Sequence, residues 1–327
     1  MANLIDTVLL LALPASGKSE LRKYMDSLTP DECRTLFHIG ATVQLDDYPY
    51  VHLMRRIDDE LAALGQARLF FQDPTRPFRN PLDWGTLIEL LNEDYDDLVA
   101  RRPIQADSAA DWLFNRYDRA GEKADLPKRL AAFDSKIRNE LGKKLEADAR
   151  KLLDAKLANY PSSLEGKTVV IEFARGGPYG AMMPLPMGYG YQYSLSMLSQ
   201  TILRRAAILH IWVTPEQSRR KNEQRADPND PGSILHHGVP LEVMLNDYGT
   251  DDMEYLITQS GRPDTVKAGK GGEGHFIPVG RFDNRQDKTT FLRQPRAQWA
   301  ASDVEAVKQE LTTAFRHIWS QYLDLHP

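Results

Sequence analysis

Residues 12–19 have a spacing that is typical of phosphate binding. The pattern requires a glycine, four free positions and then Gly-Lys-Ser or Gly-Lys-Thr; here Ala12 replaces the first glycine, while Gly17, Lys18 and Ser19 match. Gly17 lets backbone N–H groups approach phosphate oxygens, Lys18 can reach the β- and γ-phosphates, and the Ser19 hydroxyl is a ligand for Mg²⁺. We therefore expect ATP and Mg²⁺ to bind here. The predicted nucleotide contacts are Pro14, Ala15, Ser16, Gly17, Lys18, Ser19 and Glu20.

The residues on either side of this loop support the prediction. A Gly-Lys-Ser triplet often arises by chance, but this one ends an apolar run that starts at residue 8 and opens an amphipathic segment over 19–27. A strand that leads through a loop into a helix directs the positive end of the helix dipole at a bound anion. The alternative is a chance loop, and Ala12 is the position that departs from the pattern.

Two adjacent acids follow the predicted strand 41–45. In an open parallel sheet, functional groups gather at the carboxyl ends of the strands, where the phosphate loop also lies. Asp46 is the candidate base for a substrate hydroxyl, Asp47 a candidate metal ligand and Tyr48 a candidate substrate contact. The alternative is an acidic turn in which Asp47 caps a helix.

Two charged residues mark the end of the predicted strand 168–173. Glu172 stands where nucleotide-binding folds place a metal-orienting carboxylate, and Arg175 is placed to neutralise a phosphate or the substrate. Alternatively, the two side chains pair with each other near the sheet edge. The following segment 176–193 is rich in Gly, Met and Tyr and is predicted to be a flexible substrate loop that contributes Tyr179, or else a surface loop without function.

A basic helix is predicted after the strand 207–213. Its start is indicated by Thr214 as the N-cap, followed by proline. Arg219 and Arg220 are candidates to contact the transferring phosphate from a lid that spans 214–240. The alternative is a solvated basic face that pairs with nearby acids.

The alternation of apolar strands and helical segments predicts an α/β fold, specifically a P-loop NTPase three-layer sandwich around a mostly parallel, five-stranded sheet. The interval 73–165 is too long for a simple crossover and is predicted to be a helical insertion in a single domain over 1–327. A C-terminal helix is expected over 302–323, with Ser302 as its cap. The predicted strands are the apolar run from residue 8, then 41–45, 168–173, 207–213 and 276–282, the last placed at an edge because it contains a proline.

Composition limits the class of protein. The chain has 327 residues, a hydrophobic fraction of 42% and a net charge of −5, which argues against a nucleic-acid partner. The single cysteine, Cys33, excludes an internal disulfide and is typical of a reducing compartment. Because the sequence has no membrane-spanning apolar stretch and no basic signal-peptide region, we expect a cytoplasmic protein with no membrane partner and a small-molecule substrate. The oligomeric state stays open.

Three further features carry less information. The histidines at 236–237 have no third ligand near them, so the sequence does not favour a zinc site. The glycine-rich segment 269–275 has no strand before it and no helix after it and is predicted to be a connector. Asn284 follows the last predicted strand, where a loop often borders the purine, and is a candidate contact for the base.

The layout resembles the uridine kinase and phosphoribulokinase-like branch of the P-loop kinases. The likeness is carried by residues 12–19, by 46–48, which are similar to an Asp-x-aromatic-Tyr motif, by 80–87, by 171–172 and by the basic stretch 219–225. It covers about two-thirds of the chain; Ala12, the long loop after residue 175 and the helical insertion depart from it. Zeta-toxin-like kinases, which also have an Asp near a Tyr-Pro segment, are a second similar family.

The resemblance implies specific roles. Asp46 would be the general base, Lys18 and Ser19 would bind phosphate and Mg²⁺, and Arg219 and Arg220 would stabilise the transferring group. The segment that begins helix 83–91 adds Trp84 as a candidate substrate contact.

The sequence therefore predicts an ATP- and Mg²⁺-dependent kinase that acts on a hydroxyl of a small metabolite or a nucleoside-like acceptor. A P-loop ATPase that uses hydrolysis for a conformational or partner-binding role is the alternative, with Glu172 positioning water. A third possibility is a nucleotide-binding scaffold that has lost turnover.

Overall fold

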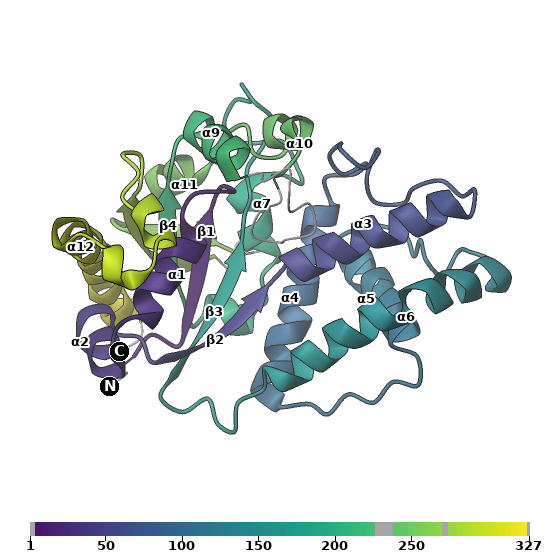
Figure 1. Ribbon diagram of the computed structural model, residues 1–327, viewed down its shortest axis with the longest axis horizontal. Coiled ribbons are helices and arrows are strands. Elements are labelled where there is room, and N and C mark those ends of the chain that lie inside the picture. Colours follow the sequence, from purple (N-terminus) through teal and green to yellow (C-terminus); the bar gives the residue numbers. More distant parts are fainter. Residues whose placement is uncertain (1–3, 226–237, 270–273, 326–327) are drawn as a thin grey trace.

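The computed structural model describes residues 4–225, 238–269 and 274–325, in which helices cover both faces of an open sheet (Figure 1). The strand order is β2-β3-β1-β4-β6-β5, so β1 lies inside the sheet. The strands are β1 (Thr7–Ala12), β2 (Ala41–Asp46), β3 (Lys167–Phe173), β4 (Ala206–Trp212), β5 (Thr265–Ala268) and β6 (His275–Asp283). The helices are α1 (Lys18–Asp26), α2 (Pro30–Phe37), α3 (Tyr48–Ala63), α4 (Asp83–Ala100), α5 (Ala109–Lys123), α6 (Ser135–Ala158), α7 (Gly190–Met197), α8 (Gln200–Leu203), α9 (Pro215–Arg225), α10 (Leu241–Asn246), α11 (Met253–Gln259) and α12 (Ala301–Leu325), with 3₁₀ turns η1 (Thr290–Arg293) and η2 (Arg296–Gln298).

The central strand β1 is buried on both faces, as its continuous apolar sequence predicts. Val8 and Leu10 face a core formed with α1, α2 and α12, whereas Leu9 and Leu11 face a core formed with α4, α7, α8 and α11. The alternation follows from the two-residue period of a strand. β1 pairs in parallel with β3 and β4, so the carboxyl ends of these strands reach the same edge of the sheet.

The sheet confirms the predicted α/β class and its mostly parallel pairing, but the prediction of five strands is wrong. A sixth strand, β5, pairs antiparallel with β6 and occupies the edge. β6 therefore lies inside the sheet, although the proline at position 278 suggested an edge strand. Proline has no backbone N–H to donate to a neighbouring strand. Pro278 is tolerated because the pairing of β6 with β4 begins one residue later, at Val279.

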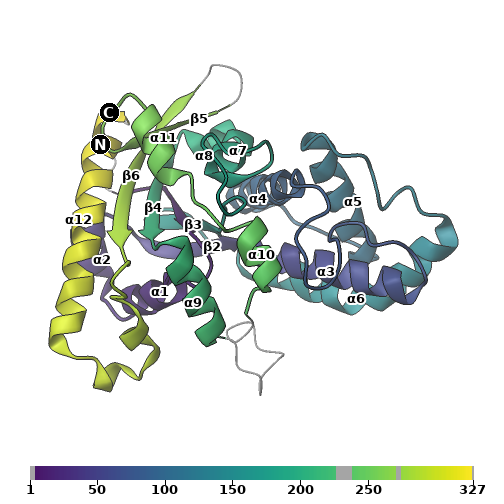
Figure 2. The same ribbon diagram turned by 90° about the horizontal axis from the view of Figure 1, so that it is seen from above.

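The segment 73–165 contains α4, α5 and α6, which pack with α3 (Figure 2). α4 also covers the sheet, because Ile88, Leu91 and Tyr95 lie in the core on that face. A buried network joins these helices: the Tyr50 hydroxyl donates to Asp94 Oδ2 at 2.6 Å, and Arg116 Nη1 donates to the Tyr50 oxygen at 2.7 Å. This network holds α3 against α4 and α5.

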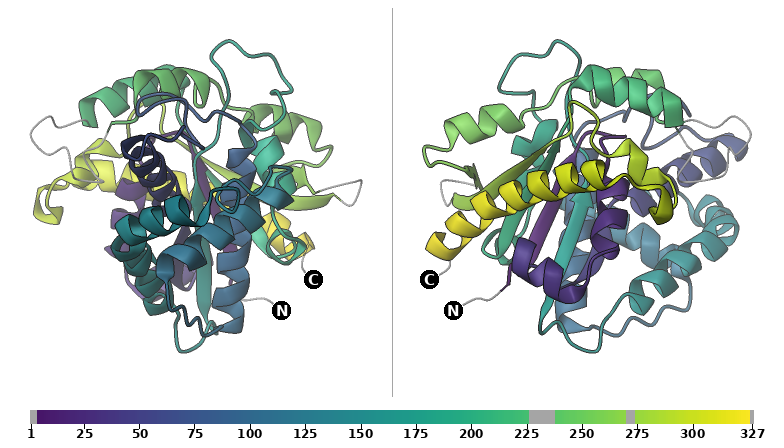
Figure 3. Two further views of the ribbon diagram at one scale, coloured as in Figure 1. Left: turned by 90° about the vertical axis from the view of Figure 1, so that its right-hand side faces the viewer. Right: turned by 60° about the vertical axis from the view of Figure 1, so that its left-hand side comes forward.

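Helix α12 runs along one face of the sheet (Figure 3). It begins at Ala301, so the expectation that Ser302 caps it is wrong; that serine lies within the first turn. Its buried residues, which include Val307, Leu311, Phe315 and Ile318, recur at helical spacing and pack against β4 and β6.

The contact between β6 and α12 leaves no room for a side chain at Gly280. A Cβ atom there would overlap the carbonyl group of Ala314 and lie 2.9 Å from Ile318 Cγ1. We expect Gly280→Ala to lower the free energy of unfolding by about 1–3 kcal/mol, measured by urea denaturation. Gly121→Ala in α5 is the matched control: its Cβ would meet ordinary contacts at 3.8 and 3.9 Å, so equal losses in both variants would contradict this packing.

Some expectations fall outside the described residues. These are the histidines at 236–237, residues 226–237 of the expected lid, and 270–273 of the glycine-rich connector. Across the ranges that the structure does describe, no helix is both long enough and apolar enough to cross a membrane.

Candidate functional site

The loop between β1 and α1 is a tight turn whose geometry could accommodate an anion. Ala15 and Gly17 both have positive φ angles, 54° and 105°, and α1 begins directly afterwards at Lys18. Leu21 N donates to Gly17 O at 2.9 Å, which starts the helical hydrogen bonding and leaves the preceding N–H groups for a ligand. The Ser16 hydroxyl is buried without a hydrogen-bond partner among the described residues. This turn therefore fits a phosphate group.

The side chain of Asn284 supports the loop between β1 and α1 through a hydrogen bond to its backbone. Its Nδ2 donates to Ser16 O at 2.7 Å and to Thr289 Oγ1 at 2.8 Å, and its Oδ1 accepts from Lys288 N at 2.6 Å. A Cβ atom on Gly17 would lie 2.5 Å from Thr289 Oγ1, so only glycine fits at this position. We call Asn284 and Thr289 together the brace of the loop. The asparagine side chain is completely buried and already hydrogen-bonded, which places it under the loop and does not support the expected contact with a base.

Lys18 lies between the loop and the end of β3. Its Nζ is 3.5 Å from Ala12 O and 3.8 Å from Glu172 Oε1. The same carboxylate accepts from Arg22 Nη1 at 3.0 Å. Glu172 therefore holds two cations next to the phosphate loop and ties the first turn of α1 to β3.

Asp46 lies opposite Glu172 in the register of β2 and β3. Its Oδ1 accepts from Tyr48 N at 2.8 Å. Burial, and then the nearby carboxylates of Glu172 and Asp47, raise the pKa of Asp46 to about 7, although Lys18 opposes the shift. A carboxyl group with this pKa is suited to accept a proton near neutral pH.

The carboxylate of Asp47 pairs with Arg175. Its Oδ2 lies 2.7 Å from Nη1 of Arg175, whose Nε donates to Ser194 Oγ at 3.0 Å. Burial raises the pKa of Asp47, and Arg175 counteracts this. The guanidinium also stacks 4.5 Å from the ring centre of Trp84. Arg175 is 1% exposed, so it supports the turn between β2 and α3.

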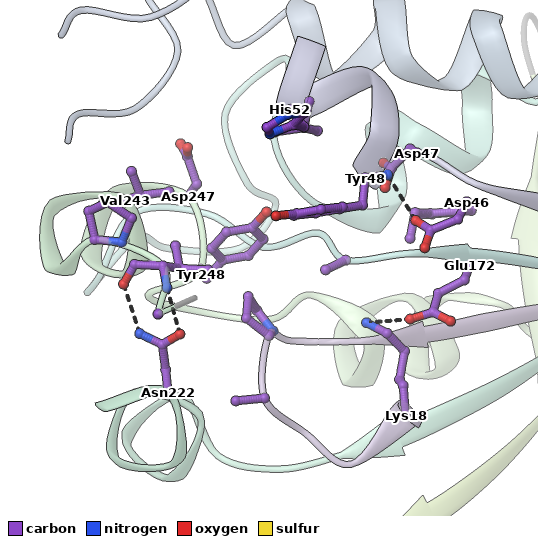
Figure 4. A pocket seen from close by; sticks show the side chains of 18 of the residues that line it. Lys18, Asp46, Asp47, Tyr48, His52, Glu172, Asn222, Val243, Asp247 and Tyr248 are labelled. Atoms are coloured by element: carbon purple, nitrogen blue, oxygen red, sulfur yellow. Dashed lines mark hydrogen bonds and ion pairs between the residues drawn. The ribbon is translucent and has the colours of Figure 1, made fainter. Parts of the chain in front are cut away.

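A cavity of about 500 Å³ connects the loop to the helical region (Figure 4). One end contains the loop, Lys18, Asp46 and Glu172. The other end is lined by one face of α3, on which Tyr48, His52 and Arg55 recur at helical spacing, and by residues around α10. The predicted residues that it brings together are Pro14, Ala15, Ser16, Gly17, Lys18, Ser19, Asp46, Asp47, Tyr48, Trp84 and Glu172.

Other predicted residues do not line this cavity. Glu20 is buried and pairs with Arg293 at 2.7 Å. Tyr179 is 62% exposed, and no residue of 176–193, all of which the structure describes, is in the cavity wall. Arg219 lies 3.4 Å from Glu216 and 5.3 Å from the ring centre of Tyr179.

Arg220 is exposed on α9 and is also absent from the wall. α9 contacts the loop through Ser218, whose hydroxyl donates to Pro14 O at 2.7 Å. The helix that was predicted to carry a lid thus supports the loop in this structure.

Sequence analysis missed seven charged, histidine or amide side chains in the cavity wall. These are Arg22, His52, Arg55, Arg56, Asp59, Asn222 and Asp247. The signal for Arg22 is its position four residues after Lys18 on α1, and that for Arg55 is its spacing from Tyr48. No sequence pattern marks Asp247, because the fold alone brings the end of α10 next to α3.

The side chains near the loop also fit a divalent cation. Mg²⁺ is usually bound by one or two carboxylates together with water and phosphate oxygens. The Ser19 hydroxyl, Asp46 and Glu172 provide such groups in one cavity, whereas Asp47 is paired with Arg175. Within the described residues, no group of three or more His, Cys, Asp or Glu side chains forms a metal-binding cluster.

Comparison with known proteins gives no relative: no protein-family model, no curated protein and no solved structure matches this chain.

Proposed function

We propose that this chain is an ATP- and Mg²⁺-dependent phosphotransferase of the P-loop NTPase fold that acts on a hydroxyl group of a small-molecule acceptor. The observation that carries the proposal is the shared cavity. An anion-binding turn with Lys18 and a carboxyl group with a pKa of about 7, Asp46, line its walls together. Beyond Asp46 the cavity continues along α3, which leaves space for an acceptor next to the base.

Each residue then has a specific task. The backbone N–H groups around Gly17 and the ammonium group of Lys18 bind the phosphates and neutralise charge in the transition state. Asp46 accepts the proton of the acceptor hydroxyl. Ser19 and Glu172 would hold Mg²⁺, which would neutralise negative charge on the phosphates. Glu172 also orients Lys18 and Arg22.

The test is whether ATP consumption requires an acceptor. We expect ADP release with Mg²⁺ to rise strongly when a pool of nucleosides, sugars, amino alcohols and hydroxy acids is added. Equal ADP release with and without the pool would favour the P-loop ATPase instead. Absence of ATP binding, measured by calorimetry, would reject both.

The rate should depend on pH through Asp46. Because only the ionised carboxylate accepts a proton, and its pKa is about 7, we expect acceptor-dependent kcat/KM to rise through pH 7 and level off above it. Glu172 raises this pKa, so Glu172→Gln should move the midpoint to lower pH as well as lowering the maximum rate. A midpoint that stays in place in this variant would show that another group controls the profile.

A further inference from the structure

The part of the cavity away from the phosphate loop contains two opposite charges without ion-pair partners among the described residues. They are Arg55 on α3 and Asp247 after α10, and both line the wall. In Figure 4, Asp247 and His52 lie at the end of the cavity remote from Lys18 and Glu172. Other charged residues on this wall are already paired: Asp59 with Arg68, for example, at 2.7 Å.

Arg55 is held rigidly. Its guanidinium lies 3.9 Å from the ring centre of Phe71, and its Nη1 donates to Pro74 O at 2.9 Å. The buried carboxylate of Asp58 in turn accepts from the backbone N–H groups of Leu69, Phe70 and Phe71, which fixes the ring. The Nε and Nη2 donors of Arg55 have no hydrogen-bond partner among the described residues, so they can bind an anionic group of a ligand without rearrangement.

The carboxylate of Asp247 lacks a cationic or hydrogen-bond-donating partner among the described residues. It is 2% exposed, and its carboxyl oxygens accept no hydrogen bond from the residues that the structure describes. Burial raises its pKa to about 7, although the positive charges of Arg55 and Arg175 lower it. Burying a carboxylate costs free energy unless a positive charge or a hydrogen-bond donor compensates for the lost water.

We propose that the acceptor is a small hydroxylated zwitterion, with its ammonium group at Asp247 and its carboxylate at Arg55. A neutral polyol would satisfy hydrogen bonds but would leave Arg55 and the buried Asp247 without an ion-pair partner. The inference rests on the proposed phosphotransferase function. In the reaction, the acceptor hydroxyl oxygen bonds to the γ-phosphorus of ATP, the bond from that phosphorus to the β,γ-bridging oxygen breaks, Asp46 takes the hydroxyl proton, and ADP leaves.

Three probes of similar length separate the two charges. Homoserine carries a hydroxyl, an ammonium and a carboxylate; 4-hydroxybutyrate lacks the ammonium, and 3-aminopropan-1-ol lacks the carboxylate. We expect kcat/KM for ADP formation to be about 10- to 100-fold higher with homoserine than with either analogue, because each analogue leaves either Asp247 or Arg55 without its ionic partner. This comparison uses the unaltered protein and does not depend on whether a variant folds.

Variants then assign each charge to its residue. Asp247→Asn should lower activity with homoserine about tenfold or more and leave that with 4-hydroxybutyrate unchanged, whereas Arg55→Gln should spare 3-aminopropan-1-ol instead. Asp111→Asn and Arg138→Gln are matched controls, since these two side chains pair with each other at 3.2 Å outside the cavity wall and should not alter the preference for the zwitterion.

The outcomes separate the two proposals. Similar activity with all three probes, or a strong preference for an uncharged acceptor from the pool, would overturn the zwitterion inference and keep the phosphotransferase. A lack of acceptor-dependent ADP formation with every compound would overturn the phosphotransferase itself. A general loss of activity in Asp247→Asn, equal for all three probes, would show a structural role for Asp247 and contradict its pairing with an ammonium group.

Discussion

Replacing Lys18 with alanine is expected to lower acceptor-dependent ATP turnover by about 10²–10³-fold, the usual effect of removing one charge-stabilising donor from a transition state. Lys18 directly follows the turn at Gly17, and its pairing with Glu172 keeps its ammonium group at the cavity wall. The loss should appear mainly in kcat, because charge on the transferring group develops in the transition state. Steady-state ADP release measures it.

Lys23→Ala is the matched control for this variant. It removes the same charge from the same helix, but Lys23 is exposed and its Nζ donates to the backbone oxygens of Arg293 and Gln294, outside the cavity. Turnover should stay close to that of the unaltered protein. If Lys18→Ala and Lys23→Ala both retain full turnover, the proposed role of Lys18 in stabilising the transferring phosphate is contradicted.

Asp46→Asn is expected to reduce acceptor-dependent turnover by about 10²–10⁴-fold, the range typical of a general base. The amide is nearly isosteric and can still accept from Tyr48 N, so the turn between β2 and α3 should persist. The KM for ATP should change little, because the base acts on the acceptor. The same variant should also remove the rise of activity through pH 7.

The control for this variant is Asp26→Asn, which neutralises an exposed carboxylate at the end of α1. Unchanged ATP consumption in Asp46→Asn would contradict the base assignment and favour hydrolysis. If ADP release loses its dependence on acceptor but persists at the basal rate, phosphoryl transfer and hydrolysis both occur and Asp46 serves only the first.

Much of the sheet could be predicted because parallel strands that are buried on both faces are continuous apolar runs. β1, β3 and β4 have this pattern. β5 was missed because its four residues, Thr265–Ala268, have no distinctive periodicity and become a strand only by pairing with β6. Local sequence does not encode such a pairing. The same pairing places β6 inside the sheet and overrides the expectation from Pro278.

The candidate site was likewise predictable from the sequence only in part. The rule that strand ends meet at one edge predicted that Asp46 and Glu172 would lie together, and the register of β2 and β3 agrees. The direction of the Arg175 side chain could not be predicted. A long side chain after a strand can turn to either side, and here Asp47, Ser194 and Trp84, from three separate elements, determine that it is buried. Asp247 depends entirely on tertiary packing.

The brace formed by Asn284 and Thr289 joins two segments that lie far apart in the sequence. Ser16 and Gly17 are synthesised before Asn284 and Thr289, which hold them, and 268 residues separate Ser16 from Asn284. We therefore expect a nascent chain to lack nucleotide affinity until residues 284–289 have left the ribosome. Binding of ATP would then stabilise only chains that extend past residue 289, and it would not stabilise products truncated before Asn284.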